Sequence, residues 1–232
     1  NKFMYHQMNS SSDMQNSTFY LSRISHEIRN PLTLIYSTAQ LLAMKHPDLG
    51  KDELWDQLIS DINYLNELTD SISAYNHCQQ LSVCPTDLNL LLQKLTDSYM
   101  PVIQHSHKKL TLTIKNPLPE LICDPLKIRE CLINLIKNSM EATSEHDIIS
   151  VTAFANPRYI HLIIGDTGKG IDSQQLKHIF EPFATYKKGG TGLGLAITQQ
   201  IIKAHHGTIR VFSKYNKGTV FIIRLPLSEP KK

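Results

Sequence analysis

Residues 189–195 read Gly-Gly-Thr-Gly-Leu-Gly-Leu and run directly into an apolar segment with helical spacing over about 193–205. Glycines at the start of a helix let several backbone N–H groups face a phosphate, which the helix dipole also favours. The run lacks the Gly-Lys-Ser/Thr of a Walker A loop, and it does not follow a strand as a dinucleotide fingerprint does. By itself, this glycine-rich loop is weak evidence for a phosphate-binding site.

The charge distribution supports a phosphate-bearing ligand. Lys187 and Lys188 precede the loop, and residues 182–232 carry nine Lys and Arg but one acidic residue. Residues 1–181 carry fifteen basic and twenty acidic side chains, so the formal net charge is only +3. A basic quarter of the chain suits nucleic acid or a small phosphate-rich ligand. Aromatic interleaving and nucleic-acid motifs are missing, so we favour the small ligand.

The chain around the loop predicts a mixed domain. Asp124-Pro125 opens a helix, with Asp as the N-cap and Pro at the first helical position. Asn216-Lys-Gly218 is a hairpin signal. The other expected elements are helices at about 87–104, 173–179 and 193–205, and strands at about 110–115, 148–155, 159–165, 207–213 and 218–225. This order favours an α+β fold, an α/β two-layer sandwich.

The helix after Asp124 carries a polar stripe. Glu130, Asn134 and Asn138 are four residues apart and share one side of the helix, with Lys137 beside them. An acid and two amides in this pattern suit a hard cation, and the lysine suits a phosphate. The alternative is an ordinary solvent-facing side. Two asparagines in mid-helix weaken that alternative, because Asn is a mediocre helix former.

A second acid follows an apolar strand at Asp166-Thr-Gly-Lys-Gly170. A carboxylate at a strand end can accept a hydrogen bond from an amine. The glycines Gly168 and Gly170 let the backbone approach a flat ligand closely. A simple turn is the alternative, since Asp-x-Gly is a common turn sequence.

The N-terminal third predicts a helical hairpin. Residues 1–18 read as a linker or the end of an upstream helix, and helices are expected at about 19–44 and 52–79, joined at His46-Pro-Asp-Leu-Gly50. Their apolar seam comprises Leu21, Ile24, Ile28, Leu32, Ile35, Leu42, Leu54, Leu58, Ile62, Leu65, Leu68, Ile72 and Tyr75. One hairpin buries too little core, so we expect two copies to form a dimeric four-helix bundle.

The first of these helices carries Ser25-His26-Glu27-Ile28-Arg29-Asn30-Pro31-Leu32. Asn30 lies one turn after His26, and Glu27 can hold one imidazole nitrogen as N–H. The other nitrogen then keeps its lone pair and can act as a nucleophile. A surface histidine with an ordinary Glu neighbour is the alternative, and it is the commoner case for a His-Glu pair alone.

The whole composition is that of a globular protein. The chain has 232 residues, 41% of them hydrophobic and 19% charged, and shows neither a membrane span nor a secretory signal. Four cysteines without metal-ligand spacing are expected to be reduced thiols. Because the chain begins with Asn1, we expect it to belong to a longer protein, and any membrane attachment to come from a segment outside this chain.

The motifs together are more specific than any one of them. His-Glu-x-Arg-Asn-Pro-Leu, Asn-x-x-x-Asn, Asp-x-Gly-x-Gly, Phe180-Glu-Pro-Phe183 and Gly-Thr-Gly-Leu-Gly-Leu occur in the order of the H, N, G1, F and G2 boxes. The chain therefore resembles the cytoplasmic core of a bacterial sensor histidine kinase over about residues 19–227. Glu141-Ala-Thr143 further resembles the nitrogen-regulatory and sporulation-kinase group.

The resemblance implies three regions: a dimerisation and histidine-phosphotransfer domain at 1–80, a linker at 81–86, and a Bergerat-type ATP-binding domain at 87–232. It implies a cytoplasmic homodimer that uses ATP and Mg²⁺, phosphorylates itself on a histidine, and passes the phosphate to an aspartate of a response-regulator receiver domain. It implies no nucleic-acid partner. Dephosphorylation of that regulator is also expected of the family.

Roles follow residue by residue from the resemblance. His26 is the expected phosphoacceptor, Glu27 orients or deprotonates it, and Asn30 aligns water for dephosphorylation. Asn134 is the expected Mg²⁺ ligand, with Glu130 acting on the metal through water, while Asp166 is expected to bind the adenine amine. The remaining expected nucleotide-binding residues are Lys137, Asn138, Gly168, Gly170, Lys187, Lys188, Gly190, Thr191, Gly192, Leu193 and Gly194. The interval 184–189 is short, which predicts a small lid.

Three other functions remain open at this stage. The same fold without kinase chemistry makes a nucleotide-gated interaction dimer or a phosphatase-only scaffold. A gyrase-type or mismatch-repair-type ATPase would use Glu130 to activate water, but it leaves the His26 helix pair without a role. A nucleic-acid binder would use the basic C-terminal quarter.

Overall fold

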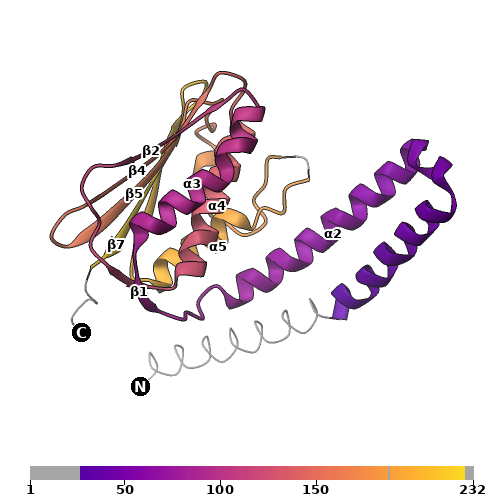
Figure 1. The fold of residues 1–232 in the computed structure, drawn as a ribbon, viewed down its shortest axis with the longest axis horizontal. Helices are drawn as coiled ribbons and strands as arrows, with labels where there is room; N and C mark the ends of the chain where they lie inside the picture. Colours follow the sequence, from indigo (N-terminus) through magenta and orange to yellow (C-terminus); the bar gives the residue numbers. More distant parts are fainter. Residues whose placement is uncertain (1–26, 188, 228–232) are drawn as a thin grey trace. The chain divides into compact units, whose positions relative to one another are not determined.

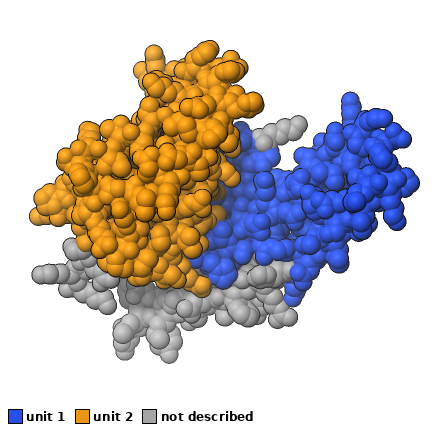
Figure 2. All heavy atoms as spheres, in the orientation of Figure 1, with its two compact units in different colours: residues 1–77, 185–193 blue, residues 78–184, 194–232 orange. Residues whose placement is uncertain are grey.

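The computed structural model describes residues 27–187 and 189–227 (Figure 1). The chain divides into two compact units (Figure 2). One unit is the helical hairpin up to His77 together with Thr185–Leu193, and the other is Cys78–Ala184 together with the chain from Gly194 onward. The predicted order, a helical region followed by an α/β sheet domain, is confirmed.

The hairpin consists of a helix at 27–45 and α2 (Glu53–His77), joined by the short 3-10 helix η1 (Pro47–Lys51). Pro47 begins η1, because its fixed φ suits a first helical position and its missing N–H has no partner there anyway. Arg29 and Asp70 join the two helices by an ion pair of 2.6 Å. The expected start of the first helix, at about residue 19, lies outside the described residues.

Most of the apolar seam is open in a single chain. Ile62 and Leu32 are buried, with 3% and 7% of their surface exposed, whereas Ile35 keeps 50% and Leu65 keeps 43%. Ile28, Leu42 and Leu58 are exposed to a similar extent. Apolar surface at regular helical spacing that one chain cannot cover is typical of a bundle completed by a second copy.

The sheet unit contains a five-stranded sheet of order β2-β4-β5-β7-β6. Its strands are β2 (Lys109–Ile114), β4 (Ile148–Ala155), β5 (Tyr159–Asp166), β6 (Thr208–Lys214) and β7 (Gly218–Pro226). β2 and β4 are parallel, and the other neighbouring pairs are antiparallel. Alternate residues of β4 and β5 are fully buried, which is the period-2 pattern of a sheet with one covered face.

Three helices cover that face (Figure 1). They are α3 (Leu88–His105), packed on β2; α4 (Pro125–Ala142), packed on β4, β5 and β7; and α5 (Gly194–Ala204), packed on β6 and α4. Together with the sheet they form the expected two layers. Asp124 caps α4 as its sequence predicts, accepting hydrogen bonds from the N–H groups of Leu126 and Lys127.

Two short strands were not predicted. β1 (Cys84–Thr86) pairs antiparallel with β3 (Leu121–Cys123), so the end of the expected linker is a strand. Three residues are too short to show a period of two, and Pro85 argued against a strand. The expected helix at 173–179 is one turn of 3-10 helix, η2 (Gln175–Lys177). None of the described helices is long and apolar enough to cross a membrane.

Candidate nucleotide site and phosphoacceptor helix

The polar stripe of α4 lies at the boundary between the core and solvent. Glu130, Asn134 and Asn138 are all half-buried, while Lys137 is exposed. The same helix buries Ile128, Leu132, Leu135 and Ile136, and this apolar side fixes how α4 turns toward the sheet. The stripe therefore has a defined orientation set by the core rather than by the polar residues themselves.

Asn134 connects α4 to the helix that follows the glycine-rich loop. Its Nδ2 donates to the carbonyl oxygen of Gly194 at 3.3 Å, and the same carbonyl accepts from Thr198 Oγ1 at 2.9 Å. Because the amide nitrogen is engaged, Oδ1 is the atom of Asn134 that can serve as a metal ligand. Glu130 supplies a carboxylate one turn earlier, paired with Lys127 at 3.2 Å. An amide oxygen and a carboxylate are a donor set that fits Mg²⁺.

Asp166 ends β5 as a nearly buried carboxylate with 8% of its surface exposed. Its Oδ1 accepts from the N–H of Gly168 at 3.0 Å, and Oδ2 accepts from Ser139 Oγ at 3.3 Å. Burial raises the pKa of this carboxyl group, and those hydrogen bonds oppose the rise. A desolvated carboxylate held by donors from two elements is a fixed acceptor for an N–H group of a ligand.

Gly168 and Gly170 allow the backbone after Asp166 to pack closely against neighbouring backbone segments. A Cβ at Gly168 would collide with the carbonyl oxygen of Ala142, where α4 ends. Gly170 has φ +66°, and a Cβ there would collide with the carbonyl of Lys214 in β6. The two glycines thus clamp this loop between α4 and the β6–β7 turn, which fixes the position of Asp166.

The glycine-rich loop is irregular until α5 begins at Gly194. Gly189 and Gly192 have φ values of +77° and +67°, which favour glycine, and a Cβ at Gly190 would lie 2.7 Å from Thr185 Oγ1. Thr191 Oγ1 accepts from the N–H of Leu193 at 3.4 Å, and Leu193 is 1% exposed. Lys187 is exposed, and Lys188 lies outside the described residues.

The described part of the phosphoacceptor helix begins at Glu27. Glu27 and Asn30 are both exposed, and His26 lies outside the described residues. Arg29, which lies between Glu27 and Asn30 in the sequence, forms an ion pair with Asp70 of α2. The ion pair therefore connects α2 to the helix that carries the motif at residues 25–32, at a position within that motif.

The structure therefore brings together the residues of the sheet unit: Asn134 contacts Gly194, and Asp166 contacts Gly168. Glu27 and Asn30 belong to the hairpin unit, and the loop Thr185–Leu193 is grouped with it rather than with α4. The sequence analysis did not identify three residues that contact this set: Ser139, which donates to Asp166; Thr198, which donates to the Gly194 carbonyl; and Asp70, which pairs with Arg29. Ser139 follows Asn138 directly, but its burial, with 1% of its surface exposed, is evident only in the structure, so the sequence offered no signal for it.

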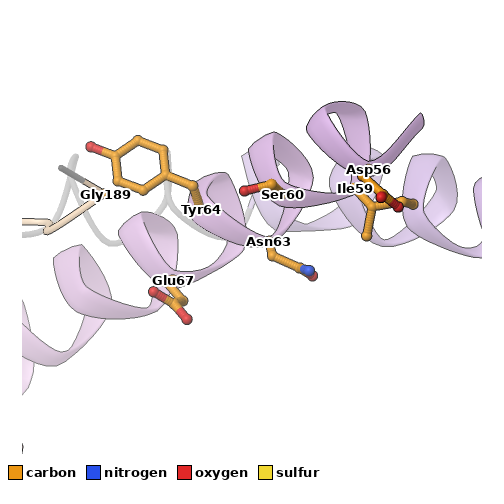
Figure 3. A pocket seen from close by; sticks show the side chains of 7 residues that line it. All are labelled: Asp56, Ile59, Ser60, Asn63, Tyr64, Glu67 and Gly189. Carbon is orange, nitrogen blue, oxygen red and sulfur yellow. The ribbon is translucent and has the colours of Figure 1, made fainter. Parts of the chain in front are cut away.

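A shallow pocket lies along α2 (Figure 3). Its lining includes two carboxylates, Asp56 and Glu67, together with Ile59, Ser60, Asn63, Tyr64 and Gly189. The negative charges of these two carboxylates would repel a triphosphate, so this pocket does not suit the phosphates of a nucleotide. None of the residues of the α4 stripe lines it, and neither does Asp166.

Comparison with known proteins supports the sequence interpretation. Residues 18–77 match the His Kinase A phospho-acceptor domain, and residues 123–229 match the histidine kinase-, DNA gyrase B- and HSP90-like ATPase domain. The sensor histidine kinase ZraS of Escherichia coli strain K12 is 33% identical over 210 residues, covering 90% of this chain and 45% of ZraS. The chain thus spans about half the length of this relative.

Two solved structures resemble the chain. Full-length ShkA in complex with AMPPNP has a TM-score of 0.77 and 24% identity, covering 92% of this chain and 46% of ShkA, which shows the common fold. Histidine kinase ThkA in complex with the response regulator TrrA has a TM-score of 0.68 and 26% identity, covering 97% of this chain and 67% of ThkA. The chain belongs to the bacterial two-component sensor histidine kinases, of which it contains the phosphoacceptor and ATPase domains.

Proposed function

We propose that this chain is the catalytic core of a protein-histidine kinase that phosphorylates His26 with ATP. The observation that carries the proposal is the hydrogen bond from Asn134 to Gly194. It joins a potential Mg²⁺ ligand to the first residue of the helix after the glycine-rich loop. A nucleotide's phosphates need both a cation and backbone N–H donors, and a potential metal ligand held at the start of a helix supports a site that offers both.

The adenine end of the nucleotide is assigned to Asp166. Its buried carboxylate accepts a hydrogen bond from the exocyclic amine of adenine, and the hydrogen bond from Ser139 keeps the carboxylate in place. The loop clamped at Gly168 and Gly170 forms the wall beside the base. ATP suits this group better than GTP, because a carboxylate cannot accept from the carbonyl oxygen that guanine carries at the corresponding position.

The phosphate end is assigned to the α4 stripe and the loop. Asn134 Oδ1 would hold Mg²⁺, Glu130 would act on it through water, and Asn138 and Lys137 are assigned to the phosphates. The loop residues assigned to the phosphates are Lys187, Lys188, Gly190, Thr191, Gly192, Leu193 and Gly194. Mg²⁺ supplies charge neutralisation on the phosphate oxygens, and the lysines and backbone N–H groups spread the charge that develops during transfer.

The transfer step uses the hairpin. Glu27 holds one imidazole nitrogen of His26 as N–H, so the other attacks the γ-phosphorus. An N–P bond forms, the bond to the bridging oxygen breaks, and ADP leaves with that bond's electron pair. The sheet unit must move to bring the γ-phosphate to His26, and residues 80–86 are the proposed hinge.

The partners follow from the same chemistry. The half-exposed seam of the hairpin is the proposed homodimer interface, completed as a four-helix bundle. A receiver domain of a response regulator takes the phosphoryl group from His26 onto an aspartate, and Asn30 aligns water when the regulator is dephosphorylated. The proposal places the chain in the cytoplasm, where ATP and the regulator are found.

Incubation with γ-labelled ATP tests the proposal. Phosphoprotein should form only with Mg²⁺, and its label should be lost in acid but resist base, as expected for a phosphoramidate. Asn134→Ala should abolish labelling while the dimer persists in gel filtration. Sustained ATP turnover without any phosphoprotein would overturn the kinase assignment in favour of an ATPase.

A further inference from the structure

The strand pair β1–β3 places two free cysteines directly opposite each other. Cys84 of β1 is the register partner of Cys123 of β3 in an antiparallel pair. Opposite residues of antiparallel strands have Cα atoms about 4.5 or 5.5 Å apart, depending on the type of pair. Both separations fall within the range of about 4.4–6.8 Å that a disulfide bond spans. Because opposite residues share a face of the sheet, their side chains extend to the same side.

The side chain of Thr86 lies near both cysteines. Cys84 Sγ lies 3.7 Å from Thr86 Oγ1, and the same side chain acts on the Cys123 thiol, where it partly opposes the rise in pKa that burial causes. Thr86 Oγ1 itself is fixed by donating to the carbonyl oxygen of Cys84 at 3.0 Å.

The two thiols differ in access. Cys84 is exposed, whereas Cys123 is fully buried. Burial raises the pKa of the Cys123 thiol, which keeps it protonated and unreactive toward oxidants in solution. An oxidant therefore meets Cys84 first, and Cys123 is the neighbour that can resolve the product. Cys78 and Cys131 are both buried, so neither offers an exposed thiol for the first step.

We propose that Cys84 and Cys123 form a reversible intramolecular disulfide when the protein meets hydrogen peroxide. The Cys84 thiolate attacks one peroxide oxygen, giving a sulfenic acid and, after protonation of the leaving hydroxide, one water molecule. The Cys123 sulfur then attacks the Cys84 sulfur, the S–O bond breaks, and a second water leaves with the thiol proton. Two thiols are thus oxidised and one peroxide is reduced, and a dithiol reductant reverses the reaction.

The position of this bond gives it a consequence for the proposed kinase. β1 forms the last part of the proposed hinge, and β3 ends at Cys123, next to the Asp124 cap of α4. Only three residue pairs hold β1 to β3, so the end of β1 can separate during domain movement. A disulfide at Cys84 removes that freedom and restricts the hinge to residues 80–83. Resting on the proposed function, we expect oxidation to slow autophosphorylation at least fivefold without changing ATP affinity.

Treatment of the purified chain with hydrogen peroxide tests the bond directly. The monomer mass should fall by two hydrogen atoms, a proteolytic map should link the peptides of Cys84 and Cys123, and dithiothreitol should restore both thiols. Cys84→Ser, at an exposed site, should leave Cys123 open to alkylation in denaturant after peroxide. Cys78→Ser is the matched control and should form the bond normally.

Three outcomes would overturn the proposal: Cys84 oxidised to sulfinic acid while Cys123 stays a free thiol, a disulfide between two chains on a non-reducing gel, or no reaction at either residue. The effect of the disulfide on the autophosphorylation rate is tested separately from the formation of the bond. A disulfide that leaves the labelling rate unchanged would overturn the restriction of the hinge. Absence of labelling in the reduced chain would instead contradict the proposed kinase function, and the thiol map would still decide the bond.

Discussion

Asp166 is the residue whose environment says most about ligand recognition. The sequence predicts this acid at the end of β5. It did not predict the partner Ser139, because a single serine among apolar helix residues carries no recognisable pattern. Only the packing of α4 on β5 shows that the carboxyl group is desolvated and hydrogen-bonded from α4.

That desolvation predicts a pH dependence of ATP binding. Because burial raises the pKa of Asp166 above the ordinary value of 3.8, the carboxylate takes up a proton at a higher pH than a free aspartate. ATP affinity should therefore fall as the pH drops through the raised pKa, before ordinary carboxylates titrate. Calorimetric titrations between pH 7.5 and 5 measure this effect. Asp166→Asn should bind weakly at every pH, and an affinity for that variant that fell in parallel with wild type would contradict the assignment.

Gly168 offers a second test at this scale. Gly168→Ala places a methyl group against the carbonyl of Ala142, so the loop must move. We expect a loss of about 2 kcal/mol or more in the free energy of unfolding, and a loss of ATP binding, measured by urea denaturation and calorimetry. Gly50→Ala is the matched control, because no heavy atom lies within 4 Å of its Cβ position. Equal effects at both sites would refute the clamp.

At the scale of the elements, the buried His205 after α5 is hydrogen-bonded to the start of α4, which in turn binds the linker. His205 Nε2 accepts from the N–H of Asp124, and its Nδ1 bonds the carbonyl of Ile201. Only the neutral ring with the proton on Nδ1 makes both bonds. The Asp124 carboxylate in turn accepts from the N–H of Ser82 at 2.8 Å. The charged or titratable groups acting on the ring are Asp124 and His206, and burial lowers the pKa of His205 below its ordinary value.

This arrangement predicts acid sensitivity of folding. A histidine with a lowered pKa in the folded state binds its proton more readily when unfolded, so stability is lost as the pH falls below about 6.5. Urea denaturation should give a lower free energy of unfolding at pH 5.5 than at pH 7.5. His205→Gln should be less stable at pH 7.5 but should lose less on acidification, whereas His46→Gln should behave as wild type. An unchanged loss in His205→Gln would contradict this account.

The hairpin seam predicts the oligomeric state. Leu65→Asp puts a charge on the proposed dimer interface, so dimers should dissociate at least tenfold more readily in analytical ultracentrifugation. Leu34→Asp is the matched control, because Leu34 is 70% exposed and lies off the seam. Equal dissociation in both variants, or in neither, would show that the seam is not the interface.

The elements also show what sequence patterns can and cannot predict. The start of α4 at Asp124-Pro125 and the β6–β7 turn at Asn216-Lys-Gly218 were predicted because cap and turn chemistry is local. β1 and β3 were not, because three-residue strands are stabilised by pairing across 34 or more residues of chain. The ion pair of Arg29 with Asp70 was also beyond prediction, since it depends on the register between two helices.

At the scale of the whole molecule, the proposed phosphoryl transfer needs both units. The sheet unit carries the residues assigned to adenine and Mg²⁺, and the hairpin unit carries the motif around His26. The order of five motifs predicted this division, because each motif comes from a different element. Their detailed contacts needed the fold.

The most direct measurement is the site of the label after incubation with γ-labelled ATP and Mg²⁺. Wild-type protein and His46→Gln, a change at an exposed hairpin histidine, should incorporate acid-labile phosphate equally. His26→Gln should incorporate none while binding ATP with unchanged affinity. Label that survives in His26→Gln would contradict the central claim that this one imidazole receives the phosphoryl group.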